Sequence, residues 1–196
     1  MTVTVEVPPR YIRYALEHAK DRNESFMPRE SYQKRVEKED RHPQVDNLIG
    51  VVGEIAFAIY ADLQIDSEIY QTGDSGIDFH LRIKDEEITV DLKTRTGDLF
   101  TFWVEEKQLQ SNEKHTPAEY YVLGKLRAPV DFDAVDIEDI ETIEGWEVKF
   151  LGTATREEFL DARRIESDKE DIDMKRSILL DNLHPVPDPD EIEQIG

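Results

Sequence analysis

The stretch Asn47–Ala61, NLIGVVGEIAFAIYA, would form a helix that is apolar on nearly every side, and its only charged residue is Glu54. Such a helix is normally buried, and a buried carboxylate either gives up its charge or needs a compensating group. We therefore expect Glu54 to face a partner elsewhere in the chain. Asn47 and Gly50 share its helical face. That face is predicted to be semi-polar, whereas the rest of the helix is predicted to lie in the core.

Two further features of this helix are predicted from its sequence. Asp46 is expected to be its N-cap, and Pro43 is expected to separate it from a preceding polar helix over Arg29–Asp40. Gly50 and Gly53 lie three residues apart, in positions where each glycine costs up to about 1 kcal/mol of helix stability. Close packing against another backbone is the expected reason for both glycines.

Two strand-like segments, GIDFHLRI from Gly76 and EITVDLKTR from Glu87, follow the helix. Apolar residues alternate in both, so each strand is predicted to have one core face and one polar face. A two-residue turn at Asp85 and Glu86 would set the register, although a longer loop stays open because this turn lacks glycine. The predicted core pairs are Ile83 with Ile88, Leu81 with Val90, and Phe79 with Leu92. The predicted polar pairs are Asp78 with Lys93, His80 with Asp91, and Arg82 with Thr89.

Asp78, Asp91 and Lys93 can converge in this register. Two carboxylates without a fixed cation suit Mg²⁺, which proteins usually hold through one or two carboxylates together with waters and phosphate oxygens. Such an ion activates water and offsets the charge that grows on a phosphodiester. Lys93 can orient the water, take its proton if its pKa is lowered, or stabilise the developing charge. Taken alone, an Asp and a Lys on one strand face also fit an ordinary surface ion pair.

The composition limits the class of protein. With 196 residues, of which 38% are hydrophobic, the chain is expected to form one domain. No segment is long and apolar enough to span a membrane, and the N-terminus lacks the basic and apolar regions of a signal peptide. We therefore expect a cytoplasmic protein that does not associate with membranes. The chain has no cysteine, which excludes thiolate chemistry and leaves oxygen and imidazole as metal ligands.

The chain is strongly acidic, with 45 Asp and Glu against 24 Lys and Arg and a net charge of −21. Ordinary apolar patterning argues against disorder, so the acidity is similar to that of proteins from salt-accumulating halophiles. At molar salt the Debye length is about 3 Å, which screens self-repulsion. The alternative is an acidic mesophilic protein, for which nucleic-acid binding would be less expected. Arg10–His42 has nine basic against seven acidic residues and can form a basic face, whereas Asp131–Glu147 is typical of a solvated acidic loop.

The remaining elements follow from periodicity and turn residues. A strand is expected at Val3–Val7, and a helix is expected from Tyr11 to Asn23. Further strands are expected at Thr101–Val104, Tyr120–Leu126 and Trp146–Gly152, with a helical start at Glu105–Gln110. A capping box of Thr155 and Glu158 is expected to open a helix that runs through Arg164. The last dozen residues are expected to fray.

The order of the polar residues resembles the PD-(D/E)XK nuclease superfamily, which has the restriction-endonuclease-like fold. Its signature is a glutamate on a helix, an aspartate on one strand and D/E-x-K on the next strand. The matching segments are Glu54 in GVVGEIAFAIY, Asp78 in GDSGIDFHL and Asp91-Leu92-Lys93 in ITVDLKTRT. Ile77 replaces the proline of the first motif. The resemblance covers about Asp46 to Arg95 by motif and continues to about Ala162 by element order.

The resemblance implies an α/β fold with a central mixed sheet of four to five strands flanked by helices. The implied core is αβββαβ, with Thr101–Val104 as its third strand. The implied organisation is an N-terminal helical extension over 1–45 within the same domain, a nuclease core over 46–165 and an acidic C-terminal tail over 166–196.

The resemblance also implies a Mg²⁺-dependent deoxyribonuclease with DNA as its partner and Mn²⁺ as a substitute metal; an endonuclease is favoured, and cleavage at a strand end stays open. The implied catalytic residues are Glu54, Asp78, Asp91 and Lys93. The metal ligands would be the three carboxylates and the Leu92 carbonyl. Residues expected near substrate are Asn47, His80, Thr94, Arg95 and Gln108. Trp103, Tyr120 and Tyr121 are assigned to core packing in preference to base stacking.

Several alternatives stay open at this point. A catalytically silent nucleic-acid-binding or assembly module could keep the same fold, and a plain acidic scaffold is a third class. The sequence also leaves open the number of metal ions, the form of the DNA and whether the chain forms a homodimer.

Overall fold

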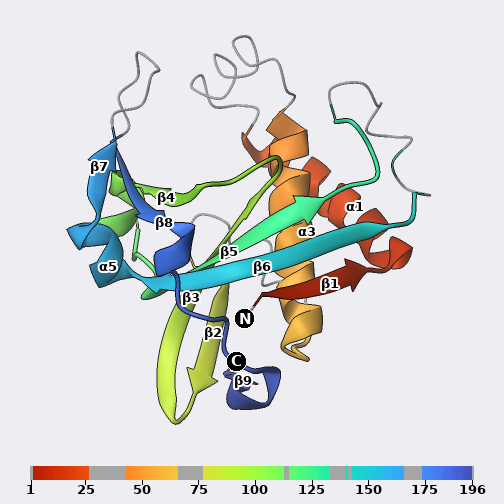
Figure 1. The fold of residues 1–196 in the computed structure, drawn as a ribbon. Coiled ribbons are helices and arrows are strands. Elements are labelled where there is room, and N and C mark those ends of the chain that lie inside the picture. The colour runs from red at the N-terminus through yellow and green to blue at the C-terminus, as the bar shows by residue number, and fades with distance from the viewer. Residues whose placement is uncertain are drawn as a thin grey trace.

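The computed structural model describes residues 2–26, 43–65, 77–112, 115–132, 140, 143–165 and 174–195. It is a mixed α/β structure with one large and one small sheet (Figure 1). The large sheet has six strands in the order β1-β6-β5-β3-β2-β9, and the small sheet has three in the order β4-β8-β7. The large sheet therefore has one strand more than the upper limit of the predicted range.

The strands of the large sheet are mostly antiparallel, and β3 with β5 is the parallel pair. Their bounds are β1 Val3–Val7, β2 Phe79–Ile83, β3 Glu86–Arg95, β5 Tyr120–Arg127, β6 Trp146–Thr155 and β9 Ile192–Gln194. The small sheet consists of β4 Thr101–Glu105, β7 Arg163–Ile165 and β8 Lys175–Leu179.

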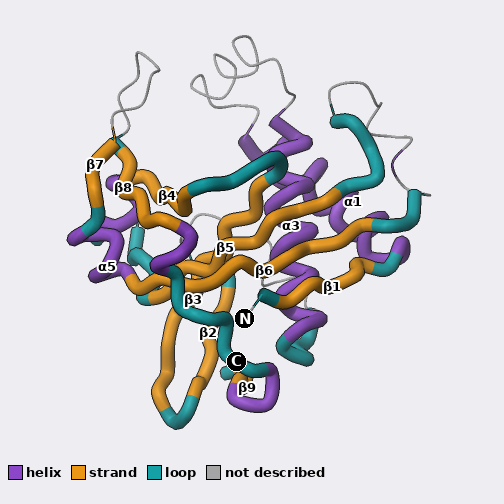
Figure 2. Tube along the Cα trace, in the orientation of Figure 1, coloured by secondary structure: helices purple, strands orange, loops and turns teal. Residues whose placement is uncertain are grey.

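Helices cover one face of the large sheet (Figures 1 and 2). The long helices are α1 Pro9–Phe26 and α3 Pro43–Tyr60, which pack against each other, and α3 lies against β3. Their shared core with the sheet includes fully buried Leu48, Phe57 and Phe150. The short elements are α5 Arg156–Asp161 and the 3₁₀ helices η1 Glu106–Leu109, η3 Leu180–Asn182 and η4 Pro189–Glu191.

A second apolar cluster fills the space between the other face of the large sheet and the small sheet. Phe102 of β4, Tyr121 and Leu123 of β5, and Phe159 of α5 are buried there. The capping box predicted for α5 is confirmed, because the Thr155 side chain accepts from the Glu158 amide and the Glu158 side chain accepts from the Thr155 amide.

The predicted register of the β2–β3 hairpin is wrong by two residues. Phe79 pairs with Val90 and Ile83 with Glu86, so the two-residue turn is Lys84-Asp85. Both turn residues have positive φ, 50° and 71°, as the tightest hairpin turns require, although neither is glycine. Because the error is an even number of residues, every side chain stays on its predicted face.

The predicted third core strand is also placed differently. β4 forms as expected but leaves the large sheet and pairs with β8 instead, Trp103 lying opposite Ser177. The chain therefore passes from β3 to its parallel neighbour β5 through the small sheet and η1. The strand order of the expected αβββαβ core is consequently not reproduced by β4.

The C-terminal segment over 174–195 is part of the fold, in contrast to the expected fraying. β8 completes the small sheet, and β9 pairs with the free edge of β2. Between them the chain crosses β6 so closely that a Cβ at Gly152, where φ is +153°, would lie 2.7 Å from the His184 carbonyl oxygen. Residues that the sequence assigned to a tail thus cover parts of both sheets.

Two expected helices have different boundaries: α5 ends at Asp161, and Arg163–Ile165 forms β7 where the helix was predicted to continue through Arg164. α3 begins at Pro43, whose restricted φ suits the first turn of a helix, so Asp46 lies inside the first turn and is not the N-cap. The predicted Arg29–Asp40 helix lies outside the described residues. None of the helices described here is long and apolar enough to cross a membrane.

Candidate active site

The site lies beside the N-terminal end of β2, where β3 continues beyond its pairing with β2. Phe79 and Val90 form the last β2–β3 pair, and residues 91–95 of β3 pair only with β5. Asp78 sits at this boundary. Its amide donates to the Val90 carbonyl at 2.8 Å, and its Oδ2 accepts from the Leu92 amide at 2.7 Å. The Asp78 carboxylate therefore accepts a hydrogen bond from the first β3 amide on this edge that has no partner in β2.

Asp91 and Lys93 project from the side of β3 that faces away from the long helices. Lys93 Nζ lies 2.7 Å from Asp91 Oδ2. The Asp91 side chain is only 5% exposed and that of Lys93 19%. The observed register, in which Phe79 pairs with Val90, brings Asp78 toward Asp91 just beyond the last pair, whereas the predicted register placed Asp78 opposite Lys93. The two-residue shift thus brings the two carboxyl groups together.

Glu54 reaches the same region from α3. It is almost fully buried, and its carboxylate lies close enough to raise the pKa of Asp91. The adjacent Gly53 explains how the helix comes so near, since a Cβ there would fall 1.7 Å from Thr94 Oγ1. Gly53 is closely packed, but against the Thr94 and Leu92 side chains of β3, so the predicted packing against another backbone is wrong. Gly50 has nothing within 4 Å of such a Cβ, so close packing does not explain it.

Burial dominates the electrostatics of the carboxyl pair. Burial and the adjacent Asp91 carboxylate together raise the pKa of Asp78 to about 7, against the opposing effects of Lys93 and of the hydrogen bond from the Leu92 amide. Burial also raises the pKa of Asp91, against the attraction of Lys93. The two carboxyl groups are within hydrogen-bonding reach, so the metal-free pair can share one proton.

The pKa of Lys93 is also raised, but by its charged neighbours and not by burial. Burial alone would lower its pKa, but the Asp91 and Asp78 carboxylates outweigh burial and raise it above the usual value. Lys93 is therefore a cation in the metal-free protein. Tyr121 lies across from Asp91 on β5, and burial together with the Asp91 charge raises the pKa of its hydroxyl.

Arg95 continues the polar side of β3 toward the small sheet. Its guanidinium lies over the ring of Trp103, 3.8 Å from the centroid. Burial lowers the pKa of Arg95, while the carboxylates of Glu105, Asp46 and Asp91 act in the opposite direction. Asp46, which the sequence assigned to capping, thus contributes negative charge near Arg95.

The other residues expected near substrate are scattered. Thr94 faces Gly53 with its hydroxyl buried and unpaired, and His80 is exposed opposite Thr89. The backbone carbonyl of Gln108 is a hydrogen-bond partner of the His115 ring and the Tyr121 hydroxyl. Asn47 has a buried side-chain nitrogen without a hydrogen-bond partner. Of this group, Arg95 is the one that shares the polar side of β3 with Asp91 and Lys93.

Sequence reasoning missed Trp103 and Lys175 as neighbours of the site. Trp103 is partly buried and lies against Arg95 and Lys175, in place of the core position assigned to it. No local signal could have found this, because it depends on β4 leaving the large sheet and pairing with a strand more than 70 residues later. Comparisons with protein-family models, curated proteins and solved structures find no match to this chain.

Proposed function

We propose that this protein is a Mg²⁺-dependent nuclease that hydrolyses DNA phosphodiester bonds, acting as an endonuclease on a restriction-endonuclease-like core. The observation that carries the proposal is the convergence of Asp78, Asp91 and Lys93 at the open edge of β3, with Glu54 beside them. The order α3, β2, β3, with the motif residues on one strand edge, supports the core assignment.

The donor set fits a hard divalent cation by its chemistry. Asp78 and Asp91 lie beside one lysine, and burial together with the Asp91 charge raises the pKa of Asp78 to about 7. A divalent cation can replace the shared proton as the compensating charge. Within the described residues no group of three or more His, Asp or Glu side chains is arranged to hold an ion by itself. Asp78 and Asp91 nevertheless supply the one or two carboxylates that Mg²⁺ usually takes from a protein.

Each residue then has a distinct role. Asp78 and Asp91 would hold the ion, with the Leu92 carbonyl and Glu54 completing its surroundings, and Mn²⁺ would substitute. When bound, the ion would supply Lewis-acid activation of water and of the phosphoryl group. The raised pKa of Lys93 favours two of its three roles, orienting the water and stabilising charge on the phosphate, over service as a base.

Cleavage assays in molar KCl test the proposal. Wild type should cut DNA with Mg²⁺ or Mn²⁺ and not with EDTA, and RNA serves as a parallel substrate. Asp91→Asn and Lys93→Met should lose activity, whereas Asp98→Asn, at a side chain that is 91% exposed, should keep it. Activity that persists in both site variants, or survives EDTA, would refute the assignment.

One observation favours a second candidate, a silent nucleic-acid-binding module on the same fold. Asp91 already has a partner in Lys93 at 2.7 Å, so its burial is compensated without a metal. Differential scanning calorimetry separates the two candidates. A nuclease site should gain stability from Mg²⁺ in wild type and lose that gain in Asp78→Asn, because a ligand that binds only the folded state raises Tm. A silent module should show the same Tm with and without Mg²⁺.

A further inference from the structure

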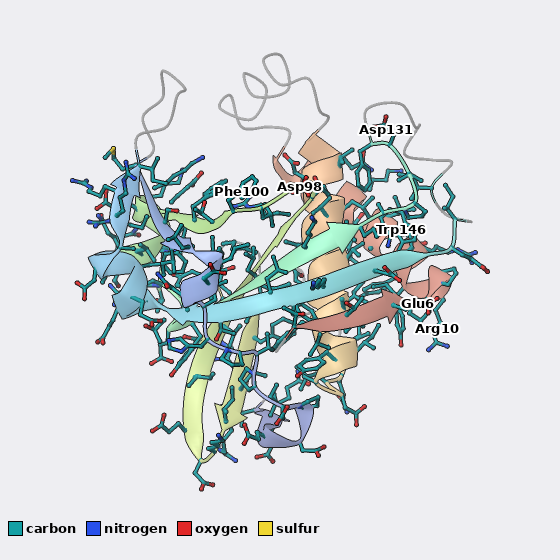
Figure 3. All side chains as sticks on the ribbon, viewed as in Figure 1. Glu6, Arg10, Asp98, Phe100, Asp131 and Trp146 are labelled. Atoms are coloured by element: carbon teal, nitrogen blue, oxygen red, sulfur yellow. The ribbon has the colours of Figure 1, made fainter. Side chains whose placement is uncertain are left out.

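The small sheet presents one solvent-facing side beside the candidate site. Trp103 of β4, Ser177 of β8 and Arg163 of β7 lie in one row, and alternation puts Lys175, Leu179 and Glu105 on the same side. We call these six residues the Trp103 face. Leu179 and Arg163 are exposed and the other four residues of the face are partly exposed, whereas Phe102 and Val104 on the opposite side are buried. The preceding connection, with Asp98 and the exposed Phe100, lies along the same edge of the molecule (Figure 3).

The Trp103 ring holds two cations. Arg95 Cζ lies 3.8 Å and Lys175 Nζ 3.7 Å from the ring centroid. Two like charges cannot occupy the same position over one ring face, so they lie over opposite faces. Each cation–π contact stabilises a position without neutralising the charge. By contrast, Arg164 and Arg176 of the same sheet share an ion pair with the Glu106 carboxylate.

The charge of this face is opposite to that of the chain. The protein carries a net charge of −21, yet Lys175 and Arg163 form no ion pair within the described residues. The one carboxylate of the face, Glu105, forms an ion pair with Lys107 at 3.0 Å and also attracts Arg95, so the six residues keep one net positive charge. Lys175, which the Trp103 ring holds in place, and exposed Arg163 fit an anionic partner.

The position of the face identifies that partner. Arg95 lies two residues beyond Lys93 on the polar side of β3, so Asp91, Lys93, Arg95, Trp103 and Lys175 form a continuous path from the carboxylates to the small sheet. We propose that the Trp103 face binds the phosphodiester backbone of the DNA strand that enters the site, an inference that rests on the proposed nuclease function. Lys175 and Arg163 contact phosphates, and Trp103 is a positioning residue that holds Arg95 and Lys175 apart.

Binding measured without cleavage tests the face directly. Fluorescence anisotropy of labelled DNA in EDTA, over a series of KCl concentrations, gives both affinity and its salt dependence. The double variant Lys175→Gln, Arg163→Gln should bind about tenfold or more weakly at the lowest salt. Its log–log salt slope should fall by about 0.9 per lost contact on duplex DNA. Lys20→Gln, an exposed residue of α1, removes the same type of charge elsewhere and should bind within about twofold of wild type.

A charge-neutral variant tests the positioning role. Trp103→Leu keeps every charge, so a purely electrostatic face would bind DNA unchanged, whereas loss of the ring should weaken binding about as much as Lys175→Gln. Trp103→Phe should restore most of the affinity because it keeps an aromatic face. Trp146 is fully buried on the other side of the molecule (Figure 3). DNA should therefore quench tryptophan emission in wild type and not in Trp103→Phe.

The outcomes separate this inference from the nuclease proposal. If wild type fails to bind DNA, or if the double variant and Lys20→Gln bind equally, the Trp103 face is not a DNA surface, whatever the cleavage assays give. Binding that depends on Lys175 and Arg163 without any metal-dependent cleavage supports the face and refutes the nuclease. Circular dichroism of each variant confirms that the fold is retained before binding is compared.

Discussion

The two sides of β3 place residues that are neighbours in sequence into opposite physical environments. On one side Ile88, Val90 and Leu92 are buried against the long helices in a continuous apolar core. On the other side Asp91 and Lys93 form a buried ion pair beside Asp78. The first side has the character of a stabilising interface, because its contacts are apolar and closely packed. The second has the character of a functional site, because it concentrates charge where burial is costly.

The difference arises at the edge of the sheet. Residues 86–90 of β3 pair with β2 along one edge of the strand. Residues 91–95 have no partner on that edge among the described strands. Carboxylates from Asp78 and Glu54 can therefore approach from the end of one strand and from a helix. Clustered charge and apolar packing are thus separated by the alternation of a single strand, and substitutions on the two sides should have different consequences.

The largest effect should come from the polar side. Asp91→Asn should reduce Mg²⁺-dependent DNA cleavage by on the order of 10²- to 10³-fold, since it removes a carboxylate that would hold the ion, and with it the stabilisation of phosphoryl charge that the ion would supply. Its Tm should change much less, because the side chain keeps its shape. Initial rates under DNA saturation, together with calorimetry, measure both. A loss of activity that only tracks a loss of folded protein would contradict the separation of the two sides.

The residue between Asp91 and Lys93 should behave in the reverse manner. Leu92→Ala removes a buried side chain from the helix side and should lower the free energy of unfolding by about 2–5 kcal/mol. Cleavage per folded molecule should remain within severalfold of wild type, because the Leu92 backbone is unchanged. Urea denaturation gives the first quantity, and activity at a temperature well below Tm gives the second. Stability equal to wild type would show that the helix side is not packed as described.

Gly53→Ala tests the closest contact between α3 and β3. The added methyl would overlap Thr94 Oγ1, so we expect a loss of about 1–3 kcal/mol of stability from overpacking. The double variant Gly53→Ala, Thr94→Ser does not relieve the contact with Oγ1, whereas Gly53→Ala, Thr94→Ala does and should recover part of the loss. Chemical denaturation of the single and double variants measures the coupling. Independent, additive effects would contradict direct contact.

The pH dependence of stability reports on the carboxyl pair. The pKa of Asp78 is raised to about 7, so between about pH 4 and pH 7 the folded metal-free protein binds more protons than the unfolded chain. Its stability should therefore fall as the pH rises through this range, by at most about 1.4 kcal/mol per pH unit for one proton. Asp78→Asn should flatten the slope. Denaturation in EDTA at several pH values tests this, and Mg²⁺ affinity should increase as the pH rises through about 7. Equal slopes in wild type and variant would exclude the pair as the cause.

The smallest effect, and one of opposite sign, is expected for Gly50→Ala. No atom lies within 4 Å of the new methyl, so the helix should gain up to about 1 kcal/mol from alanine's higher propensity. Because Gly50 shares a helical face with Glu54, cleavage at limiting DNA concentration reveals whether substrate uses this open space. Destabilisation like that of Gly53→Ala would show that the two glycines are not distinct.

Much of the local structure could be predicted from particular residues. Alternation in residues 77–83 and 88–92 assigned each side chain to its correct face, and the Thr155 and Glu158 capping box located α5. The apolar helix with Glu54, the strands β1, β5 and β6, and the ion-pairing residues of β3 also follow from sequence patterns. These features depend on interactions between residues that are close along the chain or on burial of one face.

By itself, the sequence determined which residues share a face, because side-chain alternation along a strand and helical periodicity are local properties of the backbone. Only the tertiary structure decided which faces meet. The turn at Lys84-Asp85, whose residues have positive φ, fixed the register that brings Asp78 toward Asp91. Pairing with β8 placed β4 and Trp103 in the small sheet. Likewise, contact of Gly53 with Thr94 brought Glu54 to the strand edge. Such choices depend on competing long-range pairings of similar local quality, which only the packing of the whole chain resolves.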